Sequence, residues 1–352
     1  MENITLETNE NIAMDIEQLT NGGFYPLTSF MNYTELESVL EKMRLPSEEA
    51  WPIPILFPKP HKDIRSGKTI ILKFRGIEFA KFKVDEIFSY DSKKMIKQFF
   101  GTDDDEHPGV KTMKDTTNQF MSGEIIKFKK LDEILKVEAL EPCGMKEKIK
   151  DLGWKKIVGF HTRNPPHRAH EYLHKTVLKS ADGILIHPVI GSKKSGDFTN
   201  TAILNCYKLY SKIVLPAEKS IMTPLLTYSR YAGPREALFT AIVRRNYGCT
   251  HFIVGRDHTG VKNFYGKYES QKIFKDFGDI GIEPIFFSEP YYCKICNKVT
   301  TEKECKCGKD GFVEISGTKI RKAIVNKTKL PEIYIQKEIL EELQKLDNPF
   351  IN

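Results

Sequence analysis

A short segment near the middle of the chain holds the densest group of residues that could do chemistry. In "HTRNPPHRAHEYLH", which starts at His161, Arg163 offers a forked cationic donor suited to tetrahedral oxyanions. His167 and His170 follow at a spacing of i and i+3. Asn164 is predicted to cap a helix whose first turn holds the two prolines. Because the free amides and dipole of a helix start favour anions, the segment predicts a phosphate or oxyanion site.

The same segment also permits interpretation as a zinc protease. "HEYLH" is the H-E-x-x-H pattern, in which His170 and His174 would bind zinc and Glu171 would act as the general base. The pattern is short, so chance matches are common, and the next histidine, His187, falls inside an apolar run predicted as a strand. A plain helix cap with surface histidines is a third interpretation. The arginine, the asparagine and the two spaced histidines together favour the anion site.

Two other segments carry similar features. In "FIVGRDHTG", Gly255 would let the backbone approach a ligand closely, while Arg256 and His258 would supply donors. A turn capped by the aspartate is the plainer alternative. In "ISGTKIRKAI", Ser316 is a predicted N-cap and Arg321 follows about one turn later, which would make a second helix start that faces phosphate.

Four of the seven cysteines crowd into fifteen residues near the C-terminus. Their pattern is Cys-x-x-Cys, eight residues, then Cys-x-Cys, which predicts a closed structural zinc site, with an iron–sulfur cluster as the alternative. A closed shell of four thiolates leaves no open position for catalysis. The predicted ligands are Cys293, Cys296, Cys305 and Cys307.

The elements that must position these residues follow from the hydrophobic pattern. Residues 1–148 carry short strand-like runs such as "WPIPILF" and "KTIILKFRGIEFAKFKVDEIFSY", with a few helices, and are expected to form a mainly β domain. Residues 149–287 alternate short apolar strands with amphipathic helices, which predicts an α/β domain on a parallel sheet with ligands at the carboxyl ends of the strands. Residues 288–352 are expected to form a small C-terminal domain with the cysteines and two helices.

Composition places further bounds on function. The net charge of +7 is spread among acidic residues, so it supports an anionic ligand only weakly and gives no strong case for nucleic acid. No run approaches the roughly 18 apolar residues of a membrane span. The N-terminus lacks the pattern of a signal peptide, so a cytoplasmic protein is expected, in which the cysteines are not expected to form disulfides.

Taken in order, the motifs resemble a known family. "HTRNPPHRAHE", "RYAGPREA", "VGRDHTG" and "ISGTKIR" are similar to those of sulfate adenylyltransferase (ATP sulfurylase), a nucleotidyltransferase with a His-x-x-His phosphate site. "GGFYPLTSFM" and "WPIPILF" resemble the PUA-like N-terminal domain of that family, and "HPVIGSKKSGD" resembles one of its loops. The resemblance covers nearly the whole chain and implies a Rossmann-like catalytic domain. It also implies the reaction of ATP with sulfate to give adenylyl sulfate and pyrophosphate, with magnesium accompanying ATP.

The resemblance also implies roles for single residues. Sulfate would be held by Arg163, Asn164, Arg256 and Thr259, and the transferring centre would include Thr162, Arg163 and Asn164. The phosphates and nucleotide would contact His161, His167, His170, Gly255, Arg256, Asp257 and His258. The family usually has glutamine where this chain has His161, so the affinity for sulfate or its pH dependence is expected to differ.

Several expectations complete this interpretation. The chain leaves no room after Asn352 for the kinase domain that some relatives append, so a stand-alone enzyme is expected. A homo-oligomer is expected, and neither a membrane nor a nucleic acid is expected as a partner. Two alternatives stay open: another adenylyltransferase with the same phosphate site, or an RNA-binding protein made of a PUA-like domain and a zinc module.

Overall fold

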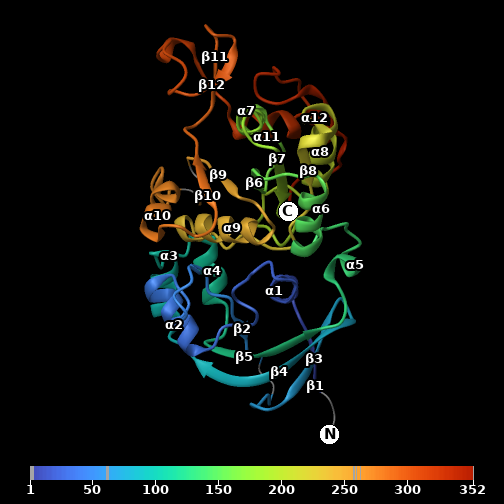
Figure 1. Cartoon of the computed structure of the whole chain (residues 1–352), viewed down its shortest axis with the longest axis vertical. Coiled ribbons are helices and arrows are strands. Elements are labelled where there is room, and N and C mark those ends of the chain that lie inside the picture. The colour runs from blue at the N-terminus through green and yellow to red at the C-terminus, as the bar shows by residue number, and fades with distance from the viewer. Residues whose placement is uncertain (1–3, 61–62, 257, 259, 262, 352) are drawn as a thin grey trace.

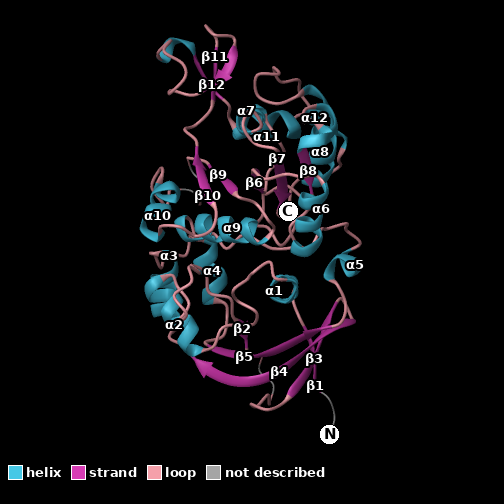
Figure 2. Cartoon of the chain, in the orientation of Figure 1, coloured by secondary structure: helices cyan, strands magenta, loops and turns pink. Residues whose placement is uncertain are grey.

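The computed structural model of the chain describes residues 4–60, 63–256, 258, 260–261 and 263–351 (Figure 1). Three sheets follow one another along the long axis of the molecule, and helices lie against the two larger sheets (Figure 2). The first and third sheets lie at opposite ends, and the parallel sheet lies between them. None of the helices in the described ranges is both long and apolar enough to span a lipid bilayer.

The N-terminal unit is built on a curved five-stranded sheet of order β1-β3-β4-β5-β2. Only the β1–β3 pair is parallel among the pairs of this sheet. The strands are β1 (Ile4–Glu7), β2 (Phe57–Pro58), β3 (Thr69–Phe74), β4 (Ile77–Ser89) and β5 (Gln119–Lys127). One face is covered by α1 (Glu10–Asn21), α2 (Tyr33–Lys42), α3 (Ser92–Phe100) and α4 (Pro108–Lys114) (Figure 1). Only Phe57 of the run "WPIPILF" lies in a strand, because the prolines within the run supply no amide hydrogen to a ladder.

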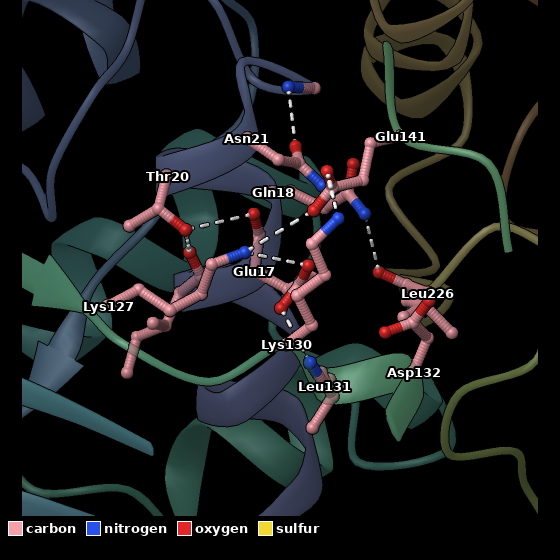
Figure 3. Close-up of polar contacts among 12 residues, drawn as sticks. Glu17, Gln18, Thr20, Asn21, Lys127, Lys130, Leu131, Asp132, Glu141 and Leu226 are labelled. Atoms are coloured by element: carbon pink, nitrogen blue, oxygen red, sulfur yellow. Dashed lines mark hydrogen bonds and ion pairs between the residues drawn. The ribbon is translucent and has the colours of Figure 1, made fainter. Parts of the chain in front are cut away.

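Helix α1 ties the N-terminal unit to the segments that lead out of it (Figure 3). The buried carboxylate of Glu17 accepts from Lys127 Nζ at 2.8 Å and from the amide of Leu131 at 3.0 Å. Its neighbour Gln18 donates to the carbonyl of Leu226, in the loop after β8 (Ser220–Met222), at 3.1 Å. One helix therefore fixes the end of β5, the start of α5 (Leu131–Leu135) and a loop of the next unit.

The middle unit has five parallel strands in the order β10-β9-β6-β7-β8. The remaining strands are β6 (Ile157–Thr162), β7 (Gly183–Pro188), β9 (His251–Val254) and β10 (Glu283–Phe286). The chain builds β6, β7 and β8 outward, then returns to add β9 beside β6, so the direction of winding reverses between β6 and β9. Ligands of such sheets bind outside the carboxyl ends of the strands at this reversal. The α/β, Rossmann-like fold expected from the sequence is confirmed.

Helices cover both faces of the parallel sheet. Val158 and Phe160 of β6 pack in one core cluster with α7 (Arg168–Val177) and α8 (Asn200–Ile213). Ile157, on the opposite face of β6, belongs to the cluster that contains α9 (Pro234–Asn246) and α10 (Glu269–Phe277). Helix α6 (Pro142–Asp151) leads into the sheet, and the short 3-10 turn η1 (Ala217–Lys219) precedes β8. The face that carries position 157, and with it positions 159 and 161, therefore looks toward α9.

The C-terminal segment contributes a small sheet and two helices. The antiparallel strands are β11 (Tyr291–Cys293), β12 (Lys298–Thr300) and β13 (Phe312–Glu314), with the turn η2 (Lys309–Gly311) before the last. Helices α11 (Gly317–Val325) and α12 (Lys337–Lys345) share the core cluster of α7 and α8. Ser316 caps α11 as expected, accepting from the amide of Lys319. The domain boundaries at 148 and 287 stay a prediction.

Candidate active site

A cavity of about 320 Å³ lies at the carboxyl ends of β6 and β9, at the reversal of the sheet. Such volumes are typical of small-molecule sites. Its lining combines polar side chains from the first motif with glycines from the "VGRDHTG" segment. The lining residues are Phe160, His161, Thr162, Arg163, Asn164, His170, Leu173, Ile253, Gly255, His258 and Gly260. The structure thus brings together two motifs that are about 90 residues apart in the chain.

Arg163 is held at the edge of the cavity with half of its donor fork unused. Nη2 donates to the carbonyl of Gly260 at 3.1 Å, and the guanidinium carbon lies 5.5 Å from the ring centre of Tyr231. Nη1 is buried and has no hydrogen-bond partner in the described part of the chain. A buried charged donor without a partner is costly unless a ligand supplies the acceptor. The side chain is therefore arranged to receive an anion.

The helix after β6 starts later than the sequence suggested. Helix α7 begins at Arg168 with His167 as its N-cap, so the prediction that Asn164 caps the helix is wrong. Asn164 and Pro165 each precede a proline, and a residue in that position is disfavoured in the α conformation. Asn164 instead lies in a turn, in which Thr162 Oγ1 donates to the Asn164 carbonyl at 3.0 Å. Its side chain does not cap the helix and instead lines the cavity.

His167 and His170 lie together at the start of α7, as their spacing predicted. Their rings stack with centroids 3.8 Å apart. Burial lowers the pKa of His167 to about 4 and holds that of His170 well below its usual range. Nδ1 of His167 has no partner among the described residues. Each of these neutral rings, at the start of a helix, can therefore donate one N–H hydrogen bond to a phosphate oxygen.

His161 and His258 face each other across the cavity floor with ring centroids 5.3 Å apart. Burial, followed by the charge of Arg244, holds the pKa of His161 well below its usual range. Burial lowers the pKa of His258 to about 3, and Arg244 again adds to the effect. Neither ring nitrogen of His161 has a hydrogen-bond partner within the described ranges. The positive charge at the floor therefore comes from arginine and not from histidine.

Helix α11, from the C-terminal segment, contacts the cavity-lining residue Asn164. Nη2 of Arg321 lies 3.4 Å from Asn164 Oδ1, and Nη1 donates to the carbonyl of Gly196 at 2.5 Å. The guanidinium also lies 4.4 Å from the ring centre of Phe198. The "ISGTKIR" motif thus adds Arg321, a second arginine, beside Asn164.

The predicted residues after β9 have mixed outcomes. Gly255 and His258 line the cavity, but the Arg256 guanidinium is ion-paired with Glu289 at 2.6 Å and is not among the lining residues. Asp257 and Thr259 lie outside the described residues. No sequence signal pointed to Glu289, because it lies 33 positions from its partner.

Sequence reasoning assigned no role to the loop after β7, which approaches Arg163 from the other side. Lys194 Nζ lies 5.7 Å from the centre of the Tyr231 ring, whose other neighbour is Arg163. Lys193 donates to the carbonyl of Gly191 at 3.3 Å, and burial lowers its pKa to about 8. The signal was present in "GSKKSGD", where two lysines between glycines follow a strand at its carboxyl end.

The zinc-protease interpretation of "HEYLH" finds no support. The fully buried His174 is hydrogen-bonded through Nδ1 to the Tyr210 hydroxyl at 2.9 Å. Glu171 is ion-paired with Arg168 at 2.9 Å and with Lys175 at 2.6 Å. Burial opposes ionisation of Glu171, but these partners outweigh it and its pKa is lowered. Among the described residues, no group of three metal-ligating side chains includes this helix.

The four cysteines of the C-terminal segment do converge. Their Sγ atoms all lie within 4.8 Å of one another. The pairs Cys296–Cys305 and Cys296–Cys307 are separated by 3.7 and 3.4 Å. Four thiolates about 2.3 Å from a tetrahedral zinc would be roughly 3.8 Å apart, so the donor set fits a metal ion of this size. The amide of Cys296 donates to Cys293 Sγ at 3.4 Å, a contact that holds the first turn.

Comparison with known proteins identifies the family. The family model described as ATP-sulfurylase matches residues 138–346, and that of a PUA-like domain matches residues 1–130. The chain belongs to the ATP-sulfurylase family. Sulfate adenylyltransferase of Pyrococcus abyssi is 38% identical over 96% of this chain and 89% of its own length. The enzyme of the same name from Hyperthermus butylicus is 39% identical over 97% of this chain and 88% of its own length.

A solved structure supports the fold of this ATP-sulfurylase family member. A protein named "Hexameric APS kinase from Thiobacillus denitrificans" superposes with a TM-score of 0.78 at 20% identity. The match covers 99% of this chain and 64% of that chain. At this identity the likeness concerns the fold alone. The PUA-like unit and the parallel sheet predicted from the sequence are confirmed.

Proposed function

We propose that this protein is a sulfate adenylyltransferase that converts ATP and sulfate to adenylyl sulfate and pyrophosphate. Membership of the ATP-sulfurylase family supports the reaction. The observation that carries the proposal is the buried, unpartnered Nη1 of Arg163 in a cavity lined by neutral histidines. A cavity with cationic and neutral donors, and without a lining carboxylate among its described residues, suits an anionic substrate.

The reaction needs no general base. A sulfate oxygen attacks the α-phosphorus as the bond from that phosphorus to the bridging oxygen of pyrophosphate breaks, and no proton has to move. The barrier is electrostatic, because a dianion must approach a polyanion in line. Arg163 would hold sulfate, and Asn164, oriented by Arg321, would contact sulfate or the α-phosphate.

The leaving group is served by the start of α7. His167 and His170 would donate to the phosphates and stabilise pyrophosphate as it departs. Because burial keeps their pKa values low, these rings act as neutral donors at pH 7. Thr162, Gly255 and His258 complete the walls around the transferring centre, and His161 replaces the glutamine usual in the family. Arg256, Asp257 and Thr259 remain proposed contacts of the nucleotide and sulfate.

Two metal ions belong to the proposal. Magnesium would accompany ATP and be held mainly through phosphate oxygens, which fits the lack of a carboxylate cluster among the described residues. Zinc would be held by Cys293, Cys296, Cys305 and Cys307 as a structural ion. It would brace the small sheet, and no step of the reaction is assigned to it.

The decisive experiment is exchange of labelled pyrophosphate into ATP. We expect exchange that requires both sulfate and magnesium, since pyrophosphate returns to ATP only through adenylyl sulfate. Exchange at the same rate without sulfate would indicate another adenylyltransferase, and its absence in folded, metal-replete protein would refute the proposal. An RNA-binding protein would instead show RNA affinity that falls steeply with salt.

The setting of the enzyme is also part of the proposal. We expect a homo-oligomer that works in the cytoplasm, and the structural neighbour, which is named as hexameric, supports an assembly only by likeness of fold. Light scattering after size-exclusion chromatography measures the mass of the particle. A mass of about 40.5 kDa, that of one chain, would contradict the expected oligomer.

A further inference from the structure

Two arginines close to the N-terminal unit, the buried Arg230 and the half-buried Arg235, have their charge compensated within the protein. Arg230 is ion-paired with Asp15. Arg235 donates to the carbonyls of Val39 at 3.1 Å and Leu40 at 2.9 Å, near the carboxyl end of α2. The dipole of a helix makes that end negative. In both cases the protein itself compensates the charge.

Arg244, on the same helix α9, has no such compensation. Its side chain is fully buried. Nη2 donates to the carbonyl of His187 at 3.0 Å, Nη1 makes a long contact of 3.4 Å to the carbonyl of Thr240, and Nε has no partner among the described residues. No described carboxylate lies within ion-pair distance of it. A buried cation without a counter-ion costs stability, and its contacts with two carbonyls return only part of that cost.

The position of the Arg244 side chain, beneath β6, brings its charge close to the cavity. A Cβ atom on Gly159 would fall 2.7 Å from Arg244 Cγ, so the absent side chain of Gly159 leaves the channel in which the arginine stem lies. His161 is two residues further along β6 and therefore on the same face of the sheet. His187, whose carbonyl takes the guanidinium, is the register partner of His161 on β7. The stem thus runs beneath β6 toward the floor of the cavity.

The electrostatic surroundings agree with this placement. Arg244 is the foremost charge that lowers the pKa values of His161 and His258, both of which line the cavity. Cys249, the first titratable group that acts on the pKa of Arg244, stays a neutral thiol because burial raises its own pKa to about 12. The unused fork of Arg163 adds the second positive charge. Arg163 and Arg244 thus place two positive charges near the cavity, and the acid that interacts with Arg163, Glu236, accepts hydrogen bonds from the amides of Arg230 and Ala232.

We infer that Arg244 is a positioning residue whose counter-ion is the bound oxyanion substrate, held on the other side of the cavity floor. The inference deepens the proposed function and rests on it. The inference predicts opposite effects of one substitution on the stability of the ligand-free protein and on its affinity for sulfate. Replacement of Arg244 by a neutral chain of similar length should leave the ligand-free protein as stable or more stable, yet weaken its hold on sulfate.

The test uses Arg244→Met and Arg244→Lys, with Arg245→Met as the matched control on the same helix. Arg245 donates to the carbonyl of Ile280 at 2.9 Å and does not line the cavity. For Arg244→Met we expect an unchanged or higher melting temperature without ligand, and a KM for sulfate raised at least about 10-fold. Arg244→Lys should recover part of that affinity, because it keeps the charge. Arg245→Met should keep the wild-type KM.

The outcomes separate the inference from the proposed function. A wild-type protein without sulfate-dependent exchange overturns the proposed function, and the inference falls with it. If the wild type is active and Arg244→Met keeps its KM for sulfate, the inference alone is wrong. A large loss of melting temperature in Arg244→Met, or failure of that variant to fold, also overturns it, because Arg244 would then be a structural residue that stabilises the sheet.

Discussion

Removal of the Arg163 side chain should separate its catalytic from its structural contribution. In Arg163→Ala the fold loses one hydrogen bond to the Gly260 carbonyl and the contact with the Tyr231 ring. These are worth about 1 kcal/mol and about 0.5–1 kcal/mol. The loss is partly offset, because Nη1 no longer has to be buried without a partner. The free energy of unfolding should therefore fall by only about 1–2 kcal/mol.

The loss of activity should be much larger. A preorganised donor aimed at developing charge is worth about 10²–10³ in kcat, or roughly 3–4 kcal/mol. Sulfate-dependent exchange of pyrophosphate into ATP, measured over a range of sulfate concentrations, separates kcat from KM. Arg65→Ala, which removes an exposed arginine paired with Asp63, controls for loss of charge and should keep the wild-type rate. Near wild-type turnover in Arg163→Ala would refute the reasoning and leave Arg163 as a surface residue of a turn.

The remaining predictions concern the helix, the cysteines and pH. His167→Ala should lower exchange at least about 100-fold, whereas Glu171→Gln, which keeps the size of a side chain paired with Arg168 and Lys175, should retain most of it; the reverse order would restore the protease interpretation. Metal analysis should find about one zinc per chain, and Cys296→Ser should lose that zinc. Iron with visible absorption, or no metal, would contradict the Cys₄ zinc site. Burial lowers the pKa of His167 to about 4 and that of His174 to about 3, below the unfolded value of about 6.5, so protonation favours the unfolded chain. The stability that these neutral histidines contribute should be fully present above about pH 6.5 and decline as pH falls toward 4. Urea midpoints that stay constant over this range of pH would contradict the low pKa values of the two histidines.

The sequence predicted the elements better than it predicted individual contacts. The strand-and-helix rhythm placed β6, β7 and β9 correctly, because short apolar runs between amphipathic helices leave few alternatives to a parallel sheet. It could not place the start of α7, where two prolines were compatible with a first turn but their effect on the preceding residues decided against it. The pairing of Arg256 with Glu289 depends on the path of the chain after β10, which no local pattern encodes.

Buried arginines form a second class of residue that sequence reasoning missed. Arg244 and Arg245 are adjacent in "VRRN", and the sequence gives no reason to assign them different environments at the polar end of a helix. In the fold one is fully buried under β6, and the other reaches toward the Ile280 carbonyl. Adjacent helix residues point in different directions, and the missing side chain of Gly159, in another element, makes room for the stem of Arg244. Such complementarity becomes visible only when both elements are in place.

Helix α7 shows how one short motif can serve two purposes without a metal. His170 lines the cavity and stacks on the N-cap residue His167, at a helix start whose dipole favours an anion. One turn later His174 is buried against Phe160, with ring centroids 4.3 Å apart, and bonded to Tyr210. Among the described residues, His170 and His174 belong to no group of three side chains that could hold a metal ion. The position of each histidine within the helix, and not the spacing of the motif, therefore decides which one can meet substrate.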